Sequence, residues 1–266
     1  MMSGQAEQSS QSVEIVNPAG CGLAIMLCEH AAHNIPEQYQ NLGLDPDHRH
    51  SHAVWDPGAR AVALKLAQEL EAPLIASRVS RLIYDCNRPP EAVSAIPERS
   101  EVIEVPGNRN MTVAQRATRV KTVYRPFCDA VTAVLVDREA RHLPTALITI
   151  HSFTPVYHGQ ARAVEIGILH DNDSRLADAI LAQSHCLPHR NIQRNAPYGP
   201  SDGVTHSLRL HGIRHGLANV MIEVRNDLLA TASAQETIAN ELLMLIRPAL
   251  ASLEPGNPWQ GGACDA

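Results

Sequence analysis

Aromatic residues and basic clusters are both scarce in this chain of 266 residues. It has only two Phe, two Trp and five Tyr, and its 22 Lys and Arg form no run and are outnumbered by 28 acids. Nucleic-acid binding relies on Lys and Arg that neutralise phosphates, and single-strand binding adds aromatic side chains on which bases stack. We therefore exclude nucleic acid as a partner.

Long hydrophobic runs and cysteine motifs are missing as well. The longest apolar stretches, such as residues 23–28 and 145–150, have the length of a strand, whereas a membrane span needs about 20 apolar residues. The six cysteines show no C-x-x-C spacing, and no signal peptide precedes them. We expect no membrane contact and a reduced, cytoplasmic location.

The sequence contains no internal repeat and no linker-like stretch, which favours one domain. Residues 1–15 are predicted to be a disordered tail, and residues 254–266, rich in Gly and Pro, a C-terminal tail. With 44% hydrophobic and 19% charged residues overall, the chain is long enough to bury one large core. We expect that core within a single domain over residues 16–253.

Short apolar runs alternate with helical patterns along this domain. The runs predict central strands in residues 22–28, 72–79, 145–150, 163–169 and 217–224. Apolar residues at helical spacing predict helices in residues 57–70, 112–141 with a break or kink at Pro126, 174–185 and 233–252. This alternation indicates an α/β fold with a mostly parallel sheet, in which ligands bind at the carboxyl ends of the strands.

Polar side chains at those ends predict a metal site, and the 14 histidines of the chain raise the same expectation. His30, Asp56 and His151 would form a three-ligand site with one position left for water, the arrangement of hydrolytic zinc sites. Such an ion lowers the pKa of its bound water to near neutrality. Glu223, at the end of another apolar run, is the expected general base.

Two neighbours of His30 are alternative metal ligands. Side chains alternate along an extended segment, so Glu29 should point away from an ion that His30 binds, unless the strand has already turned. For His33, orientation of a ligand or substrate is an equal alternative to metal binding.

Arginines gather in the segment SRVSRLIYDCNRPP, residues 77–90. Arg81 and Arg88 could each hold a substrate carboxylate through two N–H groups, with Asn87 as a further polar contact. The structural alternative is an ion pair of Arg81 or Arg88 with Asp85.

Two further arginines are candidates for the same site. Arg162 is a further candidate for substrate binding, in addition to Arg81, Arg88 and Asn87. Arg225 alternates with Glu223, so both side chains can share one face of an extended segment, where the guanidinium would keep the carboxylate ionised or stabilise an oxyanion.

Five motifs together resemble the N-formylglutamate amidohydrolase family, also called N-formylglutamate deformylase. They are, in the family's order, EHAAHNIP, WDPGA, SRLIYDCNRPP, IHSFTP and IEVRND, and the resemblance covers roughly residues 22–230. It implies a zinc-peptidase-like fold, a single-domain three-layer αβα arrangement around a mostly parallel mixed sheet. By that likeness His30, Asp56 and His151 match ligand positions, and Glu223 matches the base.

The function expected on these grounds is hydrolysis of the amide of an N-formyl or N-acyl acidic amino acid, with a divalent metal, Zn²⁺ by expectation, as cofactor. One alternative is a non-catalytic module that binds an acidic small molecule or a peptidoglycan fragment in the same pocket. A cysteine hydrolase based on Cys28 or Cys86 is a weaker alternative, since Cys28 belongs to an apolar run that favours burial of its thiol.

Overall fold

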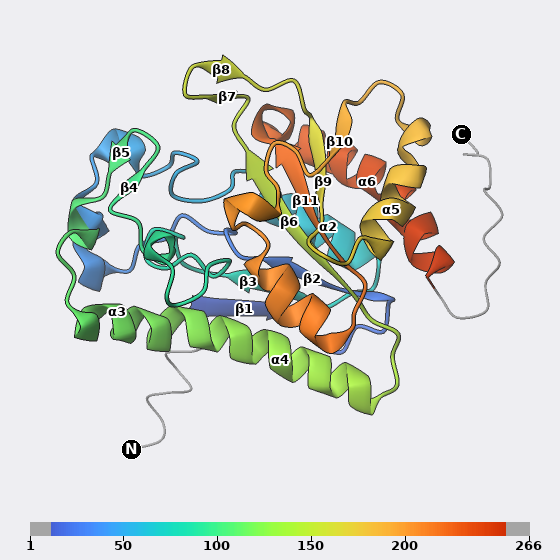
Figure 1. The fold of residues 1–266 in the computed structure, drawn as a ribbon, viewed down its shortest axis with the longest axis horizontal. Helices are drawn as coiled ribbons and strands as arrows, with labels where there is room; N and C mark the ends of the chain where they lie inside the picture. The colour runs from blue at the N-terminus through green and yellow to red at the C-terminus, as the bar shows by residue number, and fades with distance from the viewer. Residues whose placement is uncertain (1–11, 254–266) are drawn as a thin grey trace.

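Seven strands form one sheet in the computed structural model of the protein, which describes residues 12–253 (Figure 1). Their spatial order is β1-β3-β2-β6-β11-β9-β10. The strands are β1 (Val13–Val16), β2 (Ala24–Cys28), β3 (Leu74–Ser77), β6 (Ala146–Phe153), β9 (Ile166–Leu169), β10 (Ile192–Arg194) and β11 (Asn219–Arg225).

The sheet is mixed but mostly parallel. β2 runs parallel to β3 and to β6, β6 runs parallel to β11, and β9 runs parallel to β10. Only the pairs β1 with β3 and β9 with β11 are antiparallel. The predicted α/β fold with a mostly parallel mixed sheet is thereby confirmed, and each of the five apolar runs overlaps one of these strands.

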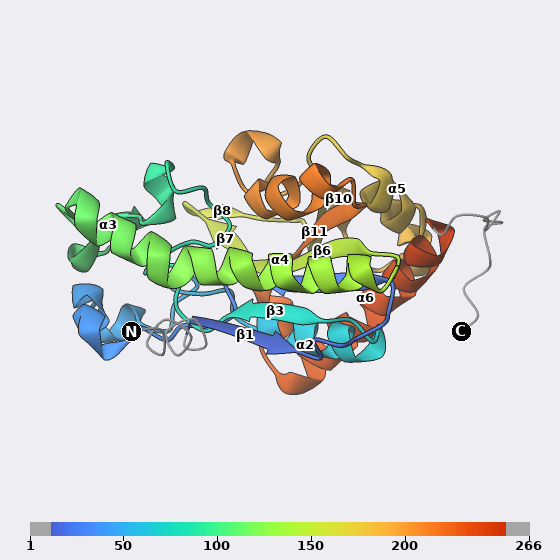
Figure 2. The same cartoon turned by 90° about the horizontal axis from the view of Figure 1, so that it is seen from below.

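Helices cover both faces of the sheet (Figures 1 and 2). On one face lie α2 (Ala59–Glu69), α5 (Arg175–Ala182) and α6 (Ala232–Ser252), whose buried residues join Met26 and Ile148 of the sheet in one hydrophobic cluster. On the other face α4 (Arg125–Ala140) packs with Ile25 and Leu147 in a second cluster. Successive residues of the central strands thus point alternately into the two hydrophobic clusters, which explains why the sequences of these strands are continuous apolar runs.

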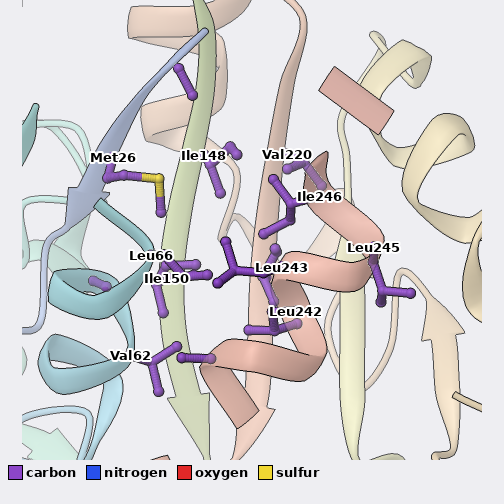
Figure 3. Packing of buried hydrophobic residues seen from close by; sticks show 14 of the residues in the cluster. Met26, Val62, Leu66, Ile148, Ile150, Val220, Leu242, Leu243, Leu245 and Ile246 are labelled. Carbon is purple, nitrogen blue, oxygen red and sulfur yellow. The ribbon is translucent and has the colours of Figure 1, made fainter. Parts of the chain in front are cut away.

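The first cluster shows why α2 and α6 dock where they do. Val62 and Leu66 of α2 and Leu242 and Ile246 of α6 are all buried and reach over the central strands (Figure 3). Apolar residues at this spacing line one face of a helix, so burial of that face fixes both helices against the sheet. The carboxyl ends of the strands are thereby held on a rigid support.

The long helix predicted over residues 112–141 is divided into three parts. α3 (Val113–Arg119) begins at a capping box made by Thr112 and Gln115, a π-helical turn (Val120–Tyr124) follows, and α4 begins at Arg125. Pro126 lies in the first turn of α4, directly after the π-helical turn, and it has no N–H with which to continue the hydrogen bonds of the preceding turn. The predicted break therefore coincides with a change of helix type.

Several short strands have no counterpart in the predictions. Residues 13–15, assigned above to the N-terminal tail, belong to β1, which pairs with β3 from Val13 with Ser77 to Val16 with Leu74. This edge strand is only four residues long and carries an acidic residue, so its sequence lacks a clear strand pattern. The disordered tail predicted for residues 1–11 and the C-terminal tail predicted for residues 254–266 lie outside the described residues.

Two small hairpins complete the list of strands. They are β4 (Arg99–Ser100) with β5 (Ile103–Glu104), and β7 (Val156–Tyr157) with β8 (Gln160–Ala161). The second hairpin projects beyond the end of β6 (Figure 1). Within residues 12–253, none of the helices has both the length and the apolar character that crossing a membrane requires.

Candidate active site

Three polar side chains meet at the carboxyl edge of the central strands. Nδ1 of His30 lies 3.2 Å from Oδ2 of Asp56, Nδ1 of His151 lies 2.9 Å from the same oxygen, and the two Nδ1 atoms are 3.2 Å apart. All three residues are at least nine-tenths buried. These three were predicted from the strand ends, and the structure brings them together as a group that could hold a metal ion.

Local backbone contacts explain how the three side chains converge. His30 follows β2 after one residue, and its carbonyl accepts a hydrogen bond of 3.0 Å from the backbone N–H of Asp56. Gly58 has a φ of +81° and lies at the start of α2, where a Cβ would come within 2.4 Å of the Cβ of Leu229. The turn that carries Asp56 therefore requires glycine two residues later.

The second ring nitrogen of His30 is bound by a carboxylate. Nε2 of His30 lies 2.8 Å from Oδ1 of Asp85, and both groups are buried. A carboxylate in this position accepts the proton of Nε2, which leaves the lone pair of Nδ1 facing Asp56 and His151 when the imidazole is neutral. The alternative predicted for Asp85 was an ion pair with Arg81 or Arg88, whereas its close partner in the structure is His30.

The facing atoms fit a divalent ion in spacing and in charge. Zinc bonds of about 2 Å in a tetrahedral site place neighbouring ligand atoms about 3.3 Å apart, close to the spacing of the three atoms here. Four carboxylates surround the cluster, those of Glu29, Asp56, Asp85 and Glu223, against two fixed cations, Arg81 and Arg88. A dication would balance this excess of negative charge.

The charges in the cluster shift one another's pKa values. Burial alone would lower the pKa of His151, but Glu29 and Asp56 raise it well above the usual value. The pKa of His30 is raised as well. Burial opposes this shift, and the carboxylates of Asp85 and Asp56 cause it. In the absence of a metal ion the two imidazoles are therefore stabilised in their protonated, ion-paired forms.

Glu223 lies beside His151 on the neighbouring strand. The two residues are register partners in the parallel pair of β6 and β11, so their side chains share one face of the sheet. Glu223 lines the same cavity as the three ligand candidates, and its Oε2 has no hydrogen-bond partner among residues 12–253. Burial raises the pKa of Glu223 to about 7, against the opposing charge of His151, which is a value suited to a group that both accepts and donates protons.

Arg81 is bound to the ligand set. Its Nη1 donates to Oδ1 of Asp56 at 2.9 Å, its Nε donates to the carbonyl of Ala53, and its Nη2 donates to the carbonyl of His52. The two oxygens of Asp56 are thus divided, one facing the guanidinium and the other facing the two imidazoles. Arg81 and His30 lower the pKa of Asp56 well below its usual range, although burial opposes this.

Arg88 and Asn87 differ in how many donors they have free. Arg88 lines the cavity, and the one hydrogen bond of its side chain among the described residues runs from Nη1 to the carbonyl of Asn87 at 2.8 Å. The side chain of Asn87 is engaged at both ends, with Nδ2 donating to the carbonyl of Val204 and Oδ1 accepting from the N–H of Ser207. Of the two, Arg88 has the unused donors.

The other two arginine candidates lie away from the cavity lining. The guanidinium of Arg162 stacks on three rings, with its Cζ 5.5 Å from the ring centre of Phe153, 4.4 Å from that of Tyr157 and 4.9 Å from that of Tyr198. These rings in turn line the cavity, so Arg162 supports the wall rather than facing the interior.

Arg225, at the end of β11, makes its ion pairs outside the cavity lining. It pairs with Asp227 at 2.8 Å and lies 3.8 Å from Glu165. The charges that lower the pKa of Glu223 come from His151, His30 and Arg81. The expectation that Arg225 keeps Glu223 ionised therefore has no counterpart in these contacts.

The alternative ligands also lie apart from the three facing atoms. Oε2 of Glu29 is 3.2 Å from Nε2 of His151, on the far side of that ring from Asp56. His33 is exposed and packs against His50 and Trp55, with ring centres 4.9 Å away in each case. Cys28 and Cys86 are fully buried, and burial raises the pKa of both thiols, which disfavours a thiolate nucleophile.

A cavity of about 350 Å³ joins these elements. It is lined by the three ligand candidates, by Glu223 and by the aromatic rings of Phe153, Tyr157 and Tyr198, which we call the aromatic wall. Sequence reasoning missed this wall and the contact of Asp85 with His30. Tyr198 lies in a loop and Tyr157 in a two-residue strand, so no periodic pattern could have identified them, although the position of Asp85 two residues before Asn87 was within the recognised motif.

Comparisons with known proteins agree with this arrangement. The family model described as N-formylglutamate amidohydrolase matches residues 23–230. A gene product of Agrobacterium tumefaciens with a solved structure is 51% identical, with a TM-score of 0.90 and coverage of 93% of this chain and 98% of that chain.

A second solved structure, the N-formylglutamate amidohydrolase from Ralstonia eutropha, has 16% identity, a TM-score of 0.66 and coverage of 90% of this chain and 97% of that chain. At this identity the similarity shows a shared fold. None of the curated proteins matches the chain significantly.

Proposed function

The chain belongs to the N-formylglutamate amidohydrolase family, and from this we propose that it is a metal-dependent hydrolase that cleaves the amide of an N-formyl or N-acyl acidic amino acid. The family indicates a hydrolase that acts on amides of small molecules. The metal, which we expect to be Zn²⁺, the acidic amino-acid part and the residue roles are our proposal.

One observation carries the proposal. Nδ1 of His30, Nδ1 of His151 and Oδ2 of Asp56 face one another at 2.9 to 3.2 Å, and the opposite nitrogen of each ring lies against a carboxylate. Lone pairs arranged in this way are ligands for a cation, and two imidazoles with one carboxylate are a donor set of hydrolytic zinc sites. When bound, a divalent ion supplies a Lewis acid that polarises the amide carbonyl and makes water more acidic.

Glu223 is the proposed general base and acid. Its unpartnered Oε2 lines the cavity beside the ligand group, where it can take the proton of the attacking water. The same carboxylic acid can then give that proton to the leaving nitrogen, since its pKa of about 7 allows transfer in both directions. Positioned acid–base groups of this kind contribute about 10² to 10⁴ in rate.

Arg88 is the proposed anchor for a substrate carboxylate. Its free guanidinium donors line the cavity, three residues after Asp85 in the sequence. A planar guanidinium can bind a carboxylate through two parallel N–H groups. Each nitrogen of the Arg81 guanidinium already donates to Asp56 or to a backbone carbonyl, so its proposed role is to hold the carboxylate of Asp56 in place.

Hydrolysis assays on metal-defined protein test this function. Protein purified without a histidine tag is analysed for bound metal and assayed on N-formylglutamate and a panel of N-acyl amino acids, before and after removal of metal by a chelator. We expect bound metal, turnover that is lost with the metal, and recovery when Zn²⁺ is returned. Turnover that persists in metal-free protein would contradict the proposal, and a metal-bound protein that binds but does not cleave these amides would support the binding-module alternative.

A further inference from the structure

Glu29 occupies a position behind His151 that the proposed reaction does not yet use. It directly follows β2, its side chain is fully buried, and its Oε2 lies 3.2 Å from Nε2 of His151. The two oxygens of Glu29 and Nε2 of His151 have no aligned hydrogen-bond partner among residues 12–253. The carboxylate of Glu29 therefore lies beside the ring of His151, and it also interacts with the hydroxyl of Ser207.

Buried polar atoms without partners are costly, so this pair calls for an explanation. An ionised carboxylate buried without a partner is strongly disfavoured, and the chain could have avoided the cost with an apolar residue at this position. The ring of His151, with Nε2 3.2 Å from Oε2 of Glu29, is a group that can offset this cost.

The geometry excludes Glu29 as a direct ligand of an ion in the cluster. Nδ1 of His151 faces Oδ2 of Asp56 at 2.9 Å, while Nε2 on the opposite side of the ring faces Glu29. The arrangement repeats the one at His30, whose Nδ1 faces the cluster and whose Nε2 lies 2.8 Å from Asp85. Each imidazole therefore stands between the cluster and its own buried carboxylate.

We propose that Glu29 is a positioning residue that holds the proton of His151 on Nε2 and so directs the lone pair of Nδ1 at the metal ion. The inference rests on the metal site of the proposed function and goes beyond it by assigning a role to a residue outside the ligand set. A carboxylate behind a ligating imidazole fixes the tautomer and the ring orientation and makes the ligating nitrogen more basic. Loss of the carboxylate should therefore weaken metal binding without removing a ligand.

Metal affinity of the Glu29→Gln variant tests this role. Metal-free protein is titrated with Co²⁺ in competition with a chromophoric chelator, and the visible absorption of bound Co²⁺ reports its coordination. We expect Glu29→Gln to bind Co²⁺ about 10- to 100-fold more weakly than the wild type. We also expect Glu29→Leu, which loses the hydrogen-bond acceptor as well as the charge, to be weaker still.

A matched control separates positioning from a general loss of buried charge. Asp171 is a carboxylate with an 8% exposed side chain that pairs with Arg209, and it lies outside the cavity lining. Asp171→Asn should leave the Co²⁺ affinity within about twofold of the wild type, while thermal unfolding of each metal-free variant shows whether its fold is intact. Equal Co²⁺ affinity of wild type and folded Glu29→Gln would overturn the inference.

A second measurement uses the wild-type protein, so the inference stays testable if the variants fail to fold. In a long-range ¹H–¹⁵N spectrum of the zinc-loaded protein, His151 should carry its proton on Nε2 and bind the metal through Nδ1. A proton on Nδ1 of His151 would overturn the role of Glu29. Both readouts are independent of hydrolysis, so an inactive protein with normal metal binding would refute the proposed reaction and leave this inference standing.

Discussion

His151 and Glu223 are register partners on the adjacent parallel strands β6 and β11. Because paired residues of parallel strands place their side chains on the same face, the pairing sets a metal-ligand candidate and a proton-transfer candidate side by side without any loop contribution. Strands are the most rigid supports for such groups. The proposed chemistry thus depends on the register of two central strands.

The first prediction concerns Glu223. We expect Glu223→Gln to lower kcat at least about a hundredfold, because the amide cannot accept the proton of water, while metal content stays at the wild-type level. Steady-state kinetics and metal analysis on the same preparations check both parts. Full activity of the variant would refute the role, and loss of metal would show that Glu223 belongs to the ligand set.

The second prediction concerns the pH dependence of metal binding. His30 and His151 have raised pKa values in the metal-free protein, so below those values the ion must displace protons from the imidazoles. The apparent Kd for Zn²⁺ should therefore rise as the pH falls from 8 to 6, by about tenfold per pH unit for each proton displaced. Competition titrations measure it, and a Kd that does not change over this range would contradict the assigned ligands.

The same pKa shifts fix the sign of a stability effect. A histidine whose folded-state pKa is raised stabilises the fold below its unfolded pKa, and this contribution is lost as the pH rises through the folded value. Metal-free protein should therefore lose stability as the pH rises through the raised pKa values, and added Zn²⁺ should restore it.

The third prediction concerns substrate binding by Arg88. Replacement by Met removes free donors that line the cavity, so KM for an acidic N-acyl substrate should rise about 10- to 100-fold, the range of one charged hydrogen bond, with kcat nearly unchanged. Arg109→Met is the matched control, because Arg109 is about half-exposed and pairs with Glu104 outside the cavity lining. An equal KM for both variants would exclude Arg88 as the anchor.

The fourth prediction concerns a buried arginine far from this chemistry. Arg138 is fully buried and has no carboxylate partner among residues 12–253, and its guanidinium instead binds oxygens of Gly20, Gly22, Pro144 and Thr145. Arg138→Met should destabilise the protein by at least about 3 kcal/mol, since each buried acceptor left unpaired costs about 1 to 3 kcal/mol.

Thermal unfolding checks this effect. A loss of that size corresponds to a Tm lowered by about 6 to 12 °C for a domain of this length. Arg247→Met is the control, because Arg247 is 54% exposed in its pair with Glu69 and should contribute less than about 1 kcal/mol. Similar Tm values for the two variants would show that the oxygens bound by Arg138 find other partners.

The central sheet could be predicted from the sequence because its strands are buried on both faces and read as unbroken apolar runs. β1 could not, since an edge strand of four residues is stabilised mainly by its pairing with β3, a contact between distant parts of the chain. The π-helical turn between α3 and α4 likewise depends on packing that no local pattern records.

The candidate site could likewise be predicted only in part from the sequence. The positions of His30, His151 and Glu223 follow from topology, because carboxyl ends of parallel strands meet at one edge. The partner of Asp85 does not follow, since a loop places it, and the nearby arginines offered a simpler local pairing. The alternation of side chains along a strand correctly predicted that Glu29 points away from the ligand group of His30. The contact of Glu29 with His151 could not be predicted in this way, because His151 lies on the neighbouring strand β6.

The central claim is that His30, Asp56 and His151 hold one divalent ion, and anomalous diffraction tests it most directly. Crystals of protein loaded with one equivalent of Zn²⁺ are measured above and below the zinc absorption edge. The account predicts one dominant peak about 2 Å from Nδ1 of His30, Oδ2 of Asp56 and Nδ1 of His151. A fully loaded crystal whose peak lies elsewhere, such as between His33 and His50, would contradict it.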